Sequence, residues 1–404
     1  MDGIVIIGAG ECGTRAAFTL REAGYGGAVS LIGDEPHLPY ERPPLSKPAE
    51  TGARLKTITT AEAMDAADIN YRQGVSALEI ETGSRSVSLN DGRIVHYDKL
   101  LLATGARPRQ LTCAGAARAL HFRSYADALE IFRRAADARR VAIIGGGLIG
   151  MELAAVLRSN ELDVSVIEMA AKPLGRAVPT RFAEQLHLVH EERGVEFFLG
   201  RGIVEIGDGF VLLEDGTRVP SDLTVAAIGV VPDVELAGKA GIATGNGILT
   251  DAYLRTSDPN VFAAGDCAAV SVNGAAPVRY ESWRNARRQA ETAGRNMAGG
   301  SEQLISTPWF WSDQYDLSLQ VVGSTAVGGT EAVLRACPNG EIEFHLLDGH
   351  LVAAAGLGTG NAVAREIKLA EMLIDAGVTL EASALRDPDV SLKDLLKATR
   401  SAAA

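Results

Sequence analysis

The chain has no excess of basic residues and no long apolar segment. Its 404 residues include 39 lysines and arginines against 51 aspartates and glutamates, a formal net charge of −12. This charge repels phosphate backbones and anionic lipids, so it argues against nucleic acid or a membrane surface as the main partner. No apolar run approaches the ~20 residues of a membrane-spanning helix, and the first residues contain no positively charged leader, so we expect no signal peptide.

Cysteine is scarce and scattered. The four residues, Cys12, Cys113, Cys267 and Cys337, lie far apart and form no C-x-x-C pair. Neither a redox disulfide nor an iron-sulfur or other metal centre has its usual ligand spacing here. We therefore expect no metal site and a location in the reducing cytoplasm.

Glycine, by contrast, is arranged in a pattern that occurs twice. In IVIIGAGECG, Gly8, Gly10 and Gly13 stand between a buried strand and a helix, which favours a dinucleotide-binding turn over a simple tight turn of small residues. The helix N-terminus would offer its N–H groups to a pyrophosphate. The acid expected to bond a ribose hydroxyl is Asp34 or Glu35, at the end of AVSLIGDE.

The second copy is VAIIGGGLIG, with Gly145, Gly147 and Gly150 before another helical segment. DVSVIE then ends in Glu168, 23 residues after Gly145 and close to the ~20 expected of a ribose-binding acid. A carboxylate there would repel the 2′-phosphate of NADP, so the pattern favours NADH.

A second pair of segments supports a duplicated fold. KLLLATGARP is echoed by LTVAAIGVVPD, each an apolar strand that ends in a glycine turn and a proline. TSDPNVFAAGDCA has no echo, and we expect it to present Asp266 at a helix start, where a carboxylate is stabilised by the helix dipole. A plain helix cap is the alternative.

Together these segments resemble the FAD-dependent, pyridine-nucleotide-linked reductases. The resemblance implies that the first glycine motif binds FAD, that Asp266 bonds the ribityl chain, and that the second motif binds NADH, with the two rings face to face. The loop PHLPYERPPLSKP lacks the cysteine of the disulfide reductase and peroxide branches. YERPPLSK and PWFWSDQYDLSLQVVG instead resemble the oxygenase-coupled, NADH-dependent ferredoxin reductases, the group of putidaredoxin reductase and the biphenyl dioxygenase reductase component.

The expected fold class is α/β, with two doubly wound dinucleotide-binding domains (FAD and NADH) and a C-terminal α+β domain. The expected boundaries are 1–108 and 229–304 for the two segments of the FAD domain, 109–228 for the NADH domain and 305–404 for the C-terminal domain.

The resemblance implies two catalytic residues. Lys47 would stabilise the reduced flavin ring by its positive charge, although a lysine without this context would be read as solvated. Glu152 would lie near the nicotinamide and Lys47, although a glutamate at a helix start also suits the helix dipole.

The resemblance also implies the cofactor contacts. Arg42 and Arg123 would contact FAD phosphate, Trp283 would pack on the flavin, and Arg176 would reach NADH phosphate or form a surface salt bridge. The full set of expected cofactor-binding residues is Gly8, Gly10, Glu11, Cys12, Gly13, Asp34, Glu35, Arg42, Lys47, Ala77, Thr104, Gly105, Arg123, Gly145, Gly147, Ile149, Gly150, Glu152, Glu168, Arg176, Gly229, Asp266, Ser282 and Trp283.

Since the chain encodes no second redox group, electrons that reach the flavin from NADH must leave to an external acceptor. The resemblance implies a [2Fe-2S] ferredoxin that serves a cytochrome P450 or a ring-hydroxylating oxygenase. Rubredoxin, a quinone or oxygen are alternative acceptors. An NADH-gated interaction module similar to apoptosis-inducing factor is a different class of function.

The segment RYESWRNARRQAETAGR carries five arginines against two glutamates. A basic helix there would steer a generally acidic ferredoxin, although a solvated face with internal ion pairs is the plainer interpretation. The family docks ferredoxin near this edge and two tryptophans, so the expected contacts are Arg284, Arg287, Arg288, Trp309 and Trp311. The expected assembly is a monomer or a homodimer.

Overall fold

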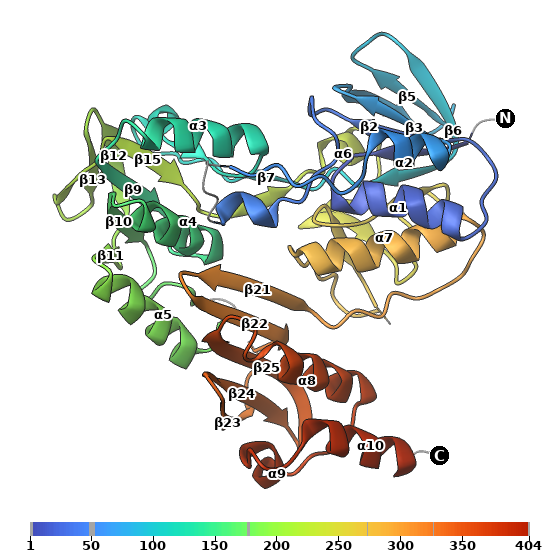
Figure 1. Cartoon of the computed structure of the whole chain (residues 1–404). Helices are drawn as coiled ribbons and strands as arrows, with labels where there is room; N and C mark the ends of the chain where they lie inside the picture. Colours follow the sequence, from blue (N-terminus) through green and yellow to red (C-terminus); the bar gives the residue numbers. More distant parts are fainter. Residues whose placement is uncertain (1–2, 48–52, 176–177, 273, 326, 403–404) are drawn as a thin grey trace. The chain divides into compact units, whose positions relative to one another are not determined.

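The computed structural model describes residues 3–47, 53–175, 178–272, 274–325 and 327–402 (Figure 1). The chain divides into two compact units, which are described one at a time. The first consists of Met1–Pro44, Arg54–Arg107 and Val230–Ser306, and the second of Leu45–Ala53, Pro108–Gly229 and Thr307–Ala404.

The first unit is built on a sheet of strand order β3-β2-β1-β6-β5-β4, with β19 paired to β6. Its parallel strands are β1 (Gly3–Ile7), β2 (Val29–Gly33), β3 (Ile69–Gln73), β6 (Ile94–Leu102) and β19 (Val261–Ala263). The antiparallel hairpin is β4 (Ala77–Glu81) and β5 (Ser86–Leu89). Every residue of β1 is buried, which is why its sequence is a continuous apolar run rather than an alternating one.

Two helices of the first unit, α1 (Glu11–Glu22) and α7 (Trp283–Met297), pack side by side (Figure 1). A Cβ atom on Gly294 would lie 2.8 Å from Thr19 Cβ, so the glycine allows the helices to approach closely. Ile6, Leu20 and Ala290 belong to the buried core of this unit. This packing brings the start of α7 and the start of α1 together.

The second unit contains a five-stranded parallel sheet of order β11-β10-β9-β15-β8. Its strands are β8 (Leu120–His121), β9 (Arg140–Ile144), β10 (Asp163–Glu168), β11 (Glu196–Leu199) and β15 (Leu223–Ala226). The associated helices are α3 (Tyr125–Ala135), α4 (Leu148–Ser159) and α5 (Thr180–Glu192), and a small sheet is formed by β12 (Ile203–Gly207), β13 (Phe210–Leu213) and β14 (Arg218–Pro220). This is the same strand–turn–helix arrangement as around β1 and α1.

The second unit also contains an antiparallel sheet of order β21-β22-β25-β24-β23. Its strands are β21 (Trp309–Gln314), β22 (Leu317–Gly323), β23 (Glu331–Cys337), β24 (Gly340–Leu347) and β25 (His350–Thr359). The chain then forms α8 (Ala364–Ala376), α9 (Ala382–Arg386) and α10 (Leu392–Ala402). The α+β character expected of the C-terminal segment is confirmed. No helix within the described ranges is long and apolar enough to cross a membrane.

Candidate active site

The two glycine motifs form turns with the same backbone geometry. Gly8 has a φ of 104° and Gly145 a φ of 107°, values that favour glycine. A Cβ atom would lie 2.1 Å from the Ala103 carbonyl oxygen at Gly8, and 2.4 Å from the Ala227 carbonyl oxygen at Gly145. A side chain at either position would collide with the backbone that follows the neighbouring strand.

The third glycine of each motif allows the helix to lie against the turn. A Cβ atom on Gly13 would be 1.8 Å from the Gly8 carbonyl oxygen, and one on Gly150 would be 2.0 Å from that of Gly145. The second glycine differs, because a Cβ atom on Gly10 or Gly147 would meet no atom within 4 Å.

Each second glycine is also the N-cap of its helix, and neither caps it through a side chain. Open space therefore adjoins the first N–H groups of α1 and of α4. This arrangement fits the pyrophosphate of a dinucleotide, which needs close approach to the backbone and a helix N-terminus to bind.

The sequence left two candidates for the acid of the first motif. Asp34 is exposed, whereas Glu35 is half-buried and accepts hydrogen bonds from Tyr40 Oη at 2.5 Å and Arg42 Nη2 at 2.7 Å. The structure thus brings Glu35 and Arg42 together.

The acid of the second motif lies at the end of β10. Glu168 accepts hydrogen bonds from the Gly146 N–H at 2.7 Å and the Ala170 N–H at 2.8 Å. Its carboxylate is therefore held against the glycine turn by backbone groups.

The expectation that Asp266 begins a helix is wrong. Asp266 lies in the turn between β19 and β20 (Ala268–Val270), and β20 pairs with β18 (Gly247–Thr250). The chain continues as a strand here because the residues after the turn enter a sheet. Helix α7 holds the turn in place, since the Gly265 N–H donates to Gln289 Oε1 at 2.7 Å.

The first turn of α7 is linked to α1. Ser282 caps α7 by accepting a hydrogen bond from the Asn285 N–H at 3.2 Å. Burial raises the pKa of Glu11, while the charge of Arg287 and a hydrogen bond from the Trp283 side chain lower it. Trp283 therefore contacts the residue that follows Gly10, with the Arg287 guanidinium 5.6 Å from its ring centroid.

Lys47 lies beside the first strand of the C-terminal sheet. It forms an ion pair with Asp313 and lies 5.4 Å from the ring centroid of Trp311. Trp309 and Trp311, two residues apart on β21, stack with ring centroids 5.2 Å apart. The structure thus brings Lys47 and both tryptophans into one cluster.

Glu152, on α4, is buried and accepts hydrogen bonds from two hydroxyl groups. Ser46 donates to one carboxylate oxygen, and Ser312 donates to the other at 2.7 Å. Burial raises the pKa of Glu152, and Lys47 and the two hydroxyls oppose this effect. Because Ser46 precedes Lys47 and Ser312 precedes Asp313, Glu152 and Lys47 are held by neighbouring residues.

Three residues of this cluster, Ser46, Ser312 and Asp313, were missed by the sequence analysis. The available signal was the polar run Ser312 to Gln314, which follows two tryptophans within one strand. Polar side chains in such a strand indicate buried partners.

The remaining expected residues lie in several elements. Ala77 begins β4, Cys12 is buried on α1, and Ile149 is 40% exposed in the first turn of α4. Thr104 donates to the Asp233 carbonyl oxygen at 2.6 Å, Gly105 and Gly229 have φ values of 73° and 90°, and the Arg123 N–H donates to Asp127. Arg176 lies outside the described residues.

The arginines near α7 are partly paired with acids. Arg279 pairs with Glu281 at 2.6 Å, Arg287 with Glu291 at 3.5 Å and Arg295 with Glu302 at 2.6 Å. Arg288 is exposed and Arg284 is half-buried. The basic surface is therefore smaller than the count of arginines suggests.

The cysteines are free, and two of them are deeply buried. Burial raises the pKa of the Cys12 and Cys267 thiols. Neither is a thiolate nucleophile at neutral pH.

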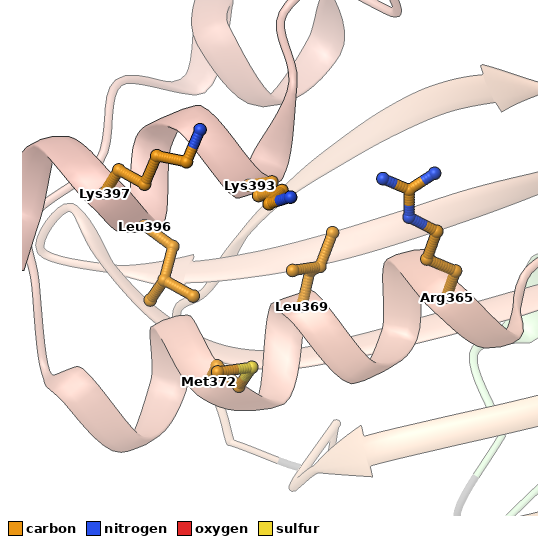
Figure 2. A pocket seen from close by; sticks show the side chains of 6 residues that line it. All are labelled: Arg365, Leu369, Met372, Lys393, Leu396 and Lys397. Carbon is orange, nitrogen blue, oxygen red and sulfur yellow. The ribbon is translucent and has the colours of Figure 1, made fainter.

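A separate hollow of about 440 Å³ lies between α8 and α10 (Figure 2). Its lining residues are Arg365, Leu369, Met372, Lys393, Leu396 and Lys397. None of these residues belongs to the glycine turns or to the cluster around Lys47.

Comparison with known proteins identifies the family. Residues 2–290 match the pyridine nucleotide-disulphide oxidoreductase family, and residues 309–396 match the reductase C-terminal family. The ferredoxin–NAD(+) reductase component of the anthranilate 1,2-dioxygenase system of Burkholderia cepacia is 39% identical over 410 residues, covering 98% of this chain and 99% of the relative.

Two crystal structures match nearly the whole chain. The ferredoxin reductase of the CYP199A2 system from Rhodopseudomonas palustris has a TM-score of 0.93 at 32% identity, covering 98% of this chain and all of the other. Putidaredoxin reductase, in its covalent complex with putidaredoxin, has a TM-score of 0.90 at 33% identity, covering 99% of each. Two parallel sheets with matching glycine turns, followed by an antiparallel sheet, place this chain in the pyridine nucleotide-disulphide oxidoreductase family, as an FAD- and NAD(H)-dependent oxidoreductase with a reductase C-terminal domain.

Proposed function

We propose that the chain is an NADH:ferredoxin reductase, which passes electrons from NADH through FAD to a [2Fe-2S] ferredoxin of a cytochrome P450 or ring-hydroxylating oxygenase. The observation that carries the proposal is the pair of glycine turns, each with an open second glycine at a helix N-terminus. The ferredoxin reductases among its relatives support the choice of acceptor.

The residues divide between the two nucleotides. We assign FAD to the turn of Gly8, Gly10 and Gly13, with Glu35 toward the ribose, and NADH to the turn of Gly145, Gly147 and Gly150, with Glu168 in the same role. This assignment retains residues 1–108 and 229–304 as the FAD domain, 109–228 as the NADH domain and 305–404 as the C-terminal domain.

When bound at the two turns, the cofactors would supply the redox chemistry, with NADH as the hydride donor and FAD as the group that exchanges both a hydride and single electrons. Lys47, fixed by Asp313, provides a positive charge, and Glu152, fixed by Ser46 and Ser312, provides a buried carboxyl group. Both groups are held by packing and hydrogen bonds, so they need little reorganisation when a substrate binds.

The electrons leave to an external acceptor, because the four free cysteines offer no second redox pair, and the ferredoxin reductases among the relatives support a protein acceptor. Two surfaces are candidates for the ferredoxin contact. One is the face of α7 with the half-buried Arg284 and the exposed Arg287 and Arg288, and the other is the stacked pair Trp309 and Trp311. A cytoplasmic location and a monomer or homodimer remain part of the proposal.

The purified protein is expected to be yellow, to contain non-covalent FAD and to be reduced by NADH. Turnover should be compared with a purified [2Fe-2S] ferredoxin and with an artificial acceptor alone. Protein that stays colourless after incubation with FAD would overturn the proposal. Full activity with the artificial acceptor but none with ferredoxins would favour rubredoxin, a quinone or oxygen, and no turnover with any acceptor would favour an NADH-gated binding module.

A further inference from the structure

A row of hydrogen-bonded side chains runs through the second unit behind Glu152. His190, on α5, is fully buried. Its Nε2 lies 2.9 Å from Gln314 Oε1, and its Nδ1 lies 3.2 Å from Tyr315 Oη. Gln314 Nε2 donates to Ser312 Oγ at 3.1 Å, and Ser312 Oγ donates to Glu152 Oε1 at 2.7 Å.

The carboxylate at one end gives the row a single direction. An ionised Glu152 can only accept, so the Ser312 proton points to it and leaves the Ser312 oxygen to accept from the Gln314 amide. The Gln314 oxygen then accepts from His190 Nε2–H, and His190 Nδ1 accepts from Tyr315. Turning the Gln314 amide over would place two acceptors against each other at Ser312.

We propose that Ser312 and Gln314 are positioning residues for Glu152, the inner members of a directed hydrogen-bond chain from Tyr315 and His190 that orients its carboxylate. The inference rests on the proposed function for the role of Glu152 in the reaction. The geometry of the chain does not depend on that role.

The charges around the two ends are consistent with this direction. Glu152 is faced by Lys47 and Asp313 besides the two serines. His190 is faced by His187 and Arg193, and burial lowers its pKa to about 4. At neutral pH the imidazole is therefore uncharged, and one nitrogen can donate while the other accepts.

The hydrogen-bond chain can be perturbed independently of the other contacts that attach α5 to the C-terminal sheet. Arg181 and Gln185 both donate to Glu341, and Arg193 pairs with Asp316 at 3.0 Å. Gln185→Met therefore removes one α5–sheet hydrogen bond and leaves the chain intact, so it is the matched control for Gln314→Met.

The test is an infrared pH titration of the Glu152 carboxyl band, identified by its loss in Glu152→Gln. Ser312→Ala should raise the titration midpoint by roughly 1–2 pH units, because a hydrogen bond to a charged group is removed. Ser312→Thr, which keeps the hydroxyl, should restore it. Gln314→Met should raise the midpoint by a smaller amount, and Gln185→Met should leave it at the wild-type value.

The pH profile for flavin reduction by NADH is the second measurement, and it should shift with the infrared midpoint in each variant. An unchanged infrared midpoint in both Ser312→Ala and Gln314→Met would overturn the proposed hydrogen-bond chain. Equal shifts of this midpoint in Gln314→Met and Gln185→Met would overturn it as well. If the infrared midpoint moves while the pH profile of flavin reduction by NADH does not, the hydrogen-bond chain is supported and the proposed role of Glu152 is overturned.

Discussion

The position of the Glu168 carboxylate is fixed by neighbouring backbone groups of the protein itself. Two backbone N–H groups, of Gly146 and Ala170, donate to it, so its negative charge is fixed at the end of β10 beside the glycine turn. Under the proposed assignment of this turn to NADH, a negative charge there would disfavour a nucleotide that carries a further phosphate on the adenosine ribose.

Glu168→Gln tests this at the scale of one residue, since the amide keeps an acceptor and removes the charge. We expect the preference for NADH over NADPH, measured as the ratio of kcat/KM values, to fall about tenfold, which corresponds to about 1.4 kcal/mol. The exposed Glu192, at the end of α5, provides a control as Glu192→Gln. An unchanged preference in Glu168→Gln would show that another group selects the nucleotide.

At the scale of the element, two glycines of the turn between β9 and α4 allow effects on stability and effects on nucleotide binding to be tested separately. Gly150→Ala would place a Cβ atom 2.0 Å from a carbonyl oxygen, a clash that should cost about 1–3 kcal/mol of stability. Gly147→Ala meets no protein atom and should change the unfolding free energy by at most about 1 kcal/mol. Its methyl group would occupy the space proposed for phosphate, so the Kd for NADH should rise about tenfold.

Thermal unfolding and NADH titration of the two variants measure these effects separately. Gly147→Ala protein that binds NADH as tightly as the wild type would contradict the assignment of this turn to the nucleotide. The same comparison of Gly10→Ala with Gly13→Ala applies to FAD at the first turn.

Helix α7 offers a second test at this scale. Its buried face packs on α1, and its exposed face carries Arg287 and Arg288. Arg287 is engaged by Glu291 and Trp283, so reversing its charge would also disturb the helix. Arg288 is therefore the better position for a charge-reversal test.

Arg288→Glu should raise the KM for an acidic ferredoxin by roughly 3–10-fold at low salt and leave flavin reduction by NADH unchanged. The effect should shrink as added salt screens the charge. Arg118→Glu, the same change on an exposed residue of another element, serves as the control. Equal losses with both variants would point to net charge rather than to α7.

At the scale of the whole molecule, the buried His190 makes stability depend on pH. Its pKa falls from 6.5 to about 4 in the folded chain, so between these values the unfolded chain binds more protons. The contribution of His190 to the free energy of unfolding is therefore fully present above pH 6.5. It is lost as the pH falls toward 4, by about 3 kcal/mol in total. His345, whose pKa is also lowered by burial, adds to the loss in the same direction.

His190→Gln should flatten the dependence of the unfolding free energy on pH between about 6.5 and 4.5, and the exposed His350→Gln should not. Denaturant unfolding at a series of pH values measures both slopes. Because the slope is compared rather than the absolute stability, a general loss of stability in His190→Gln does not obscure the result. Parallel slopes in the two variants would contradict the role of His190.

The sequence alone determined the two strand–glycine–helix turns, the strand-terminal acid Glu168 and the family. These features are local, because a positive φ, a buried strand and a helix start are encoded by residues that lie next to one another. The α+β character of the C-terminal segment was expected in the same way, from the alternation of apolar residues and the helical pattern that follows it.

Only the tertiary structure decided which groups meet across long separations. Asp34 and Glu35 are adjacent acids, and the partners Tyr40 and Arg42 distinguish them. Asp266 enters a strand rather than a helix because β18 is available to pair with the residues that follow. The bonds that join Glu152 to Ser312 and Gln314 to His190 link different elements, and a polar residue in a strand acquires a partner only when the fold buries it.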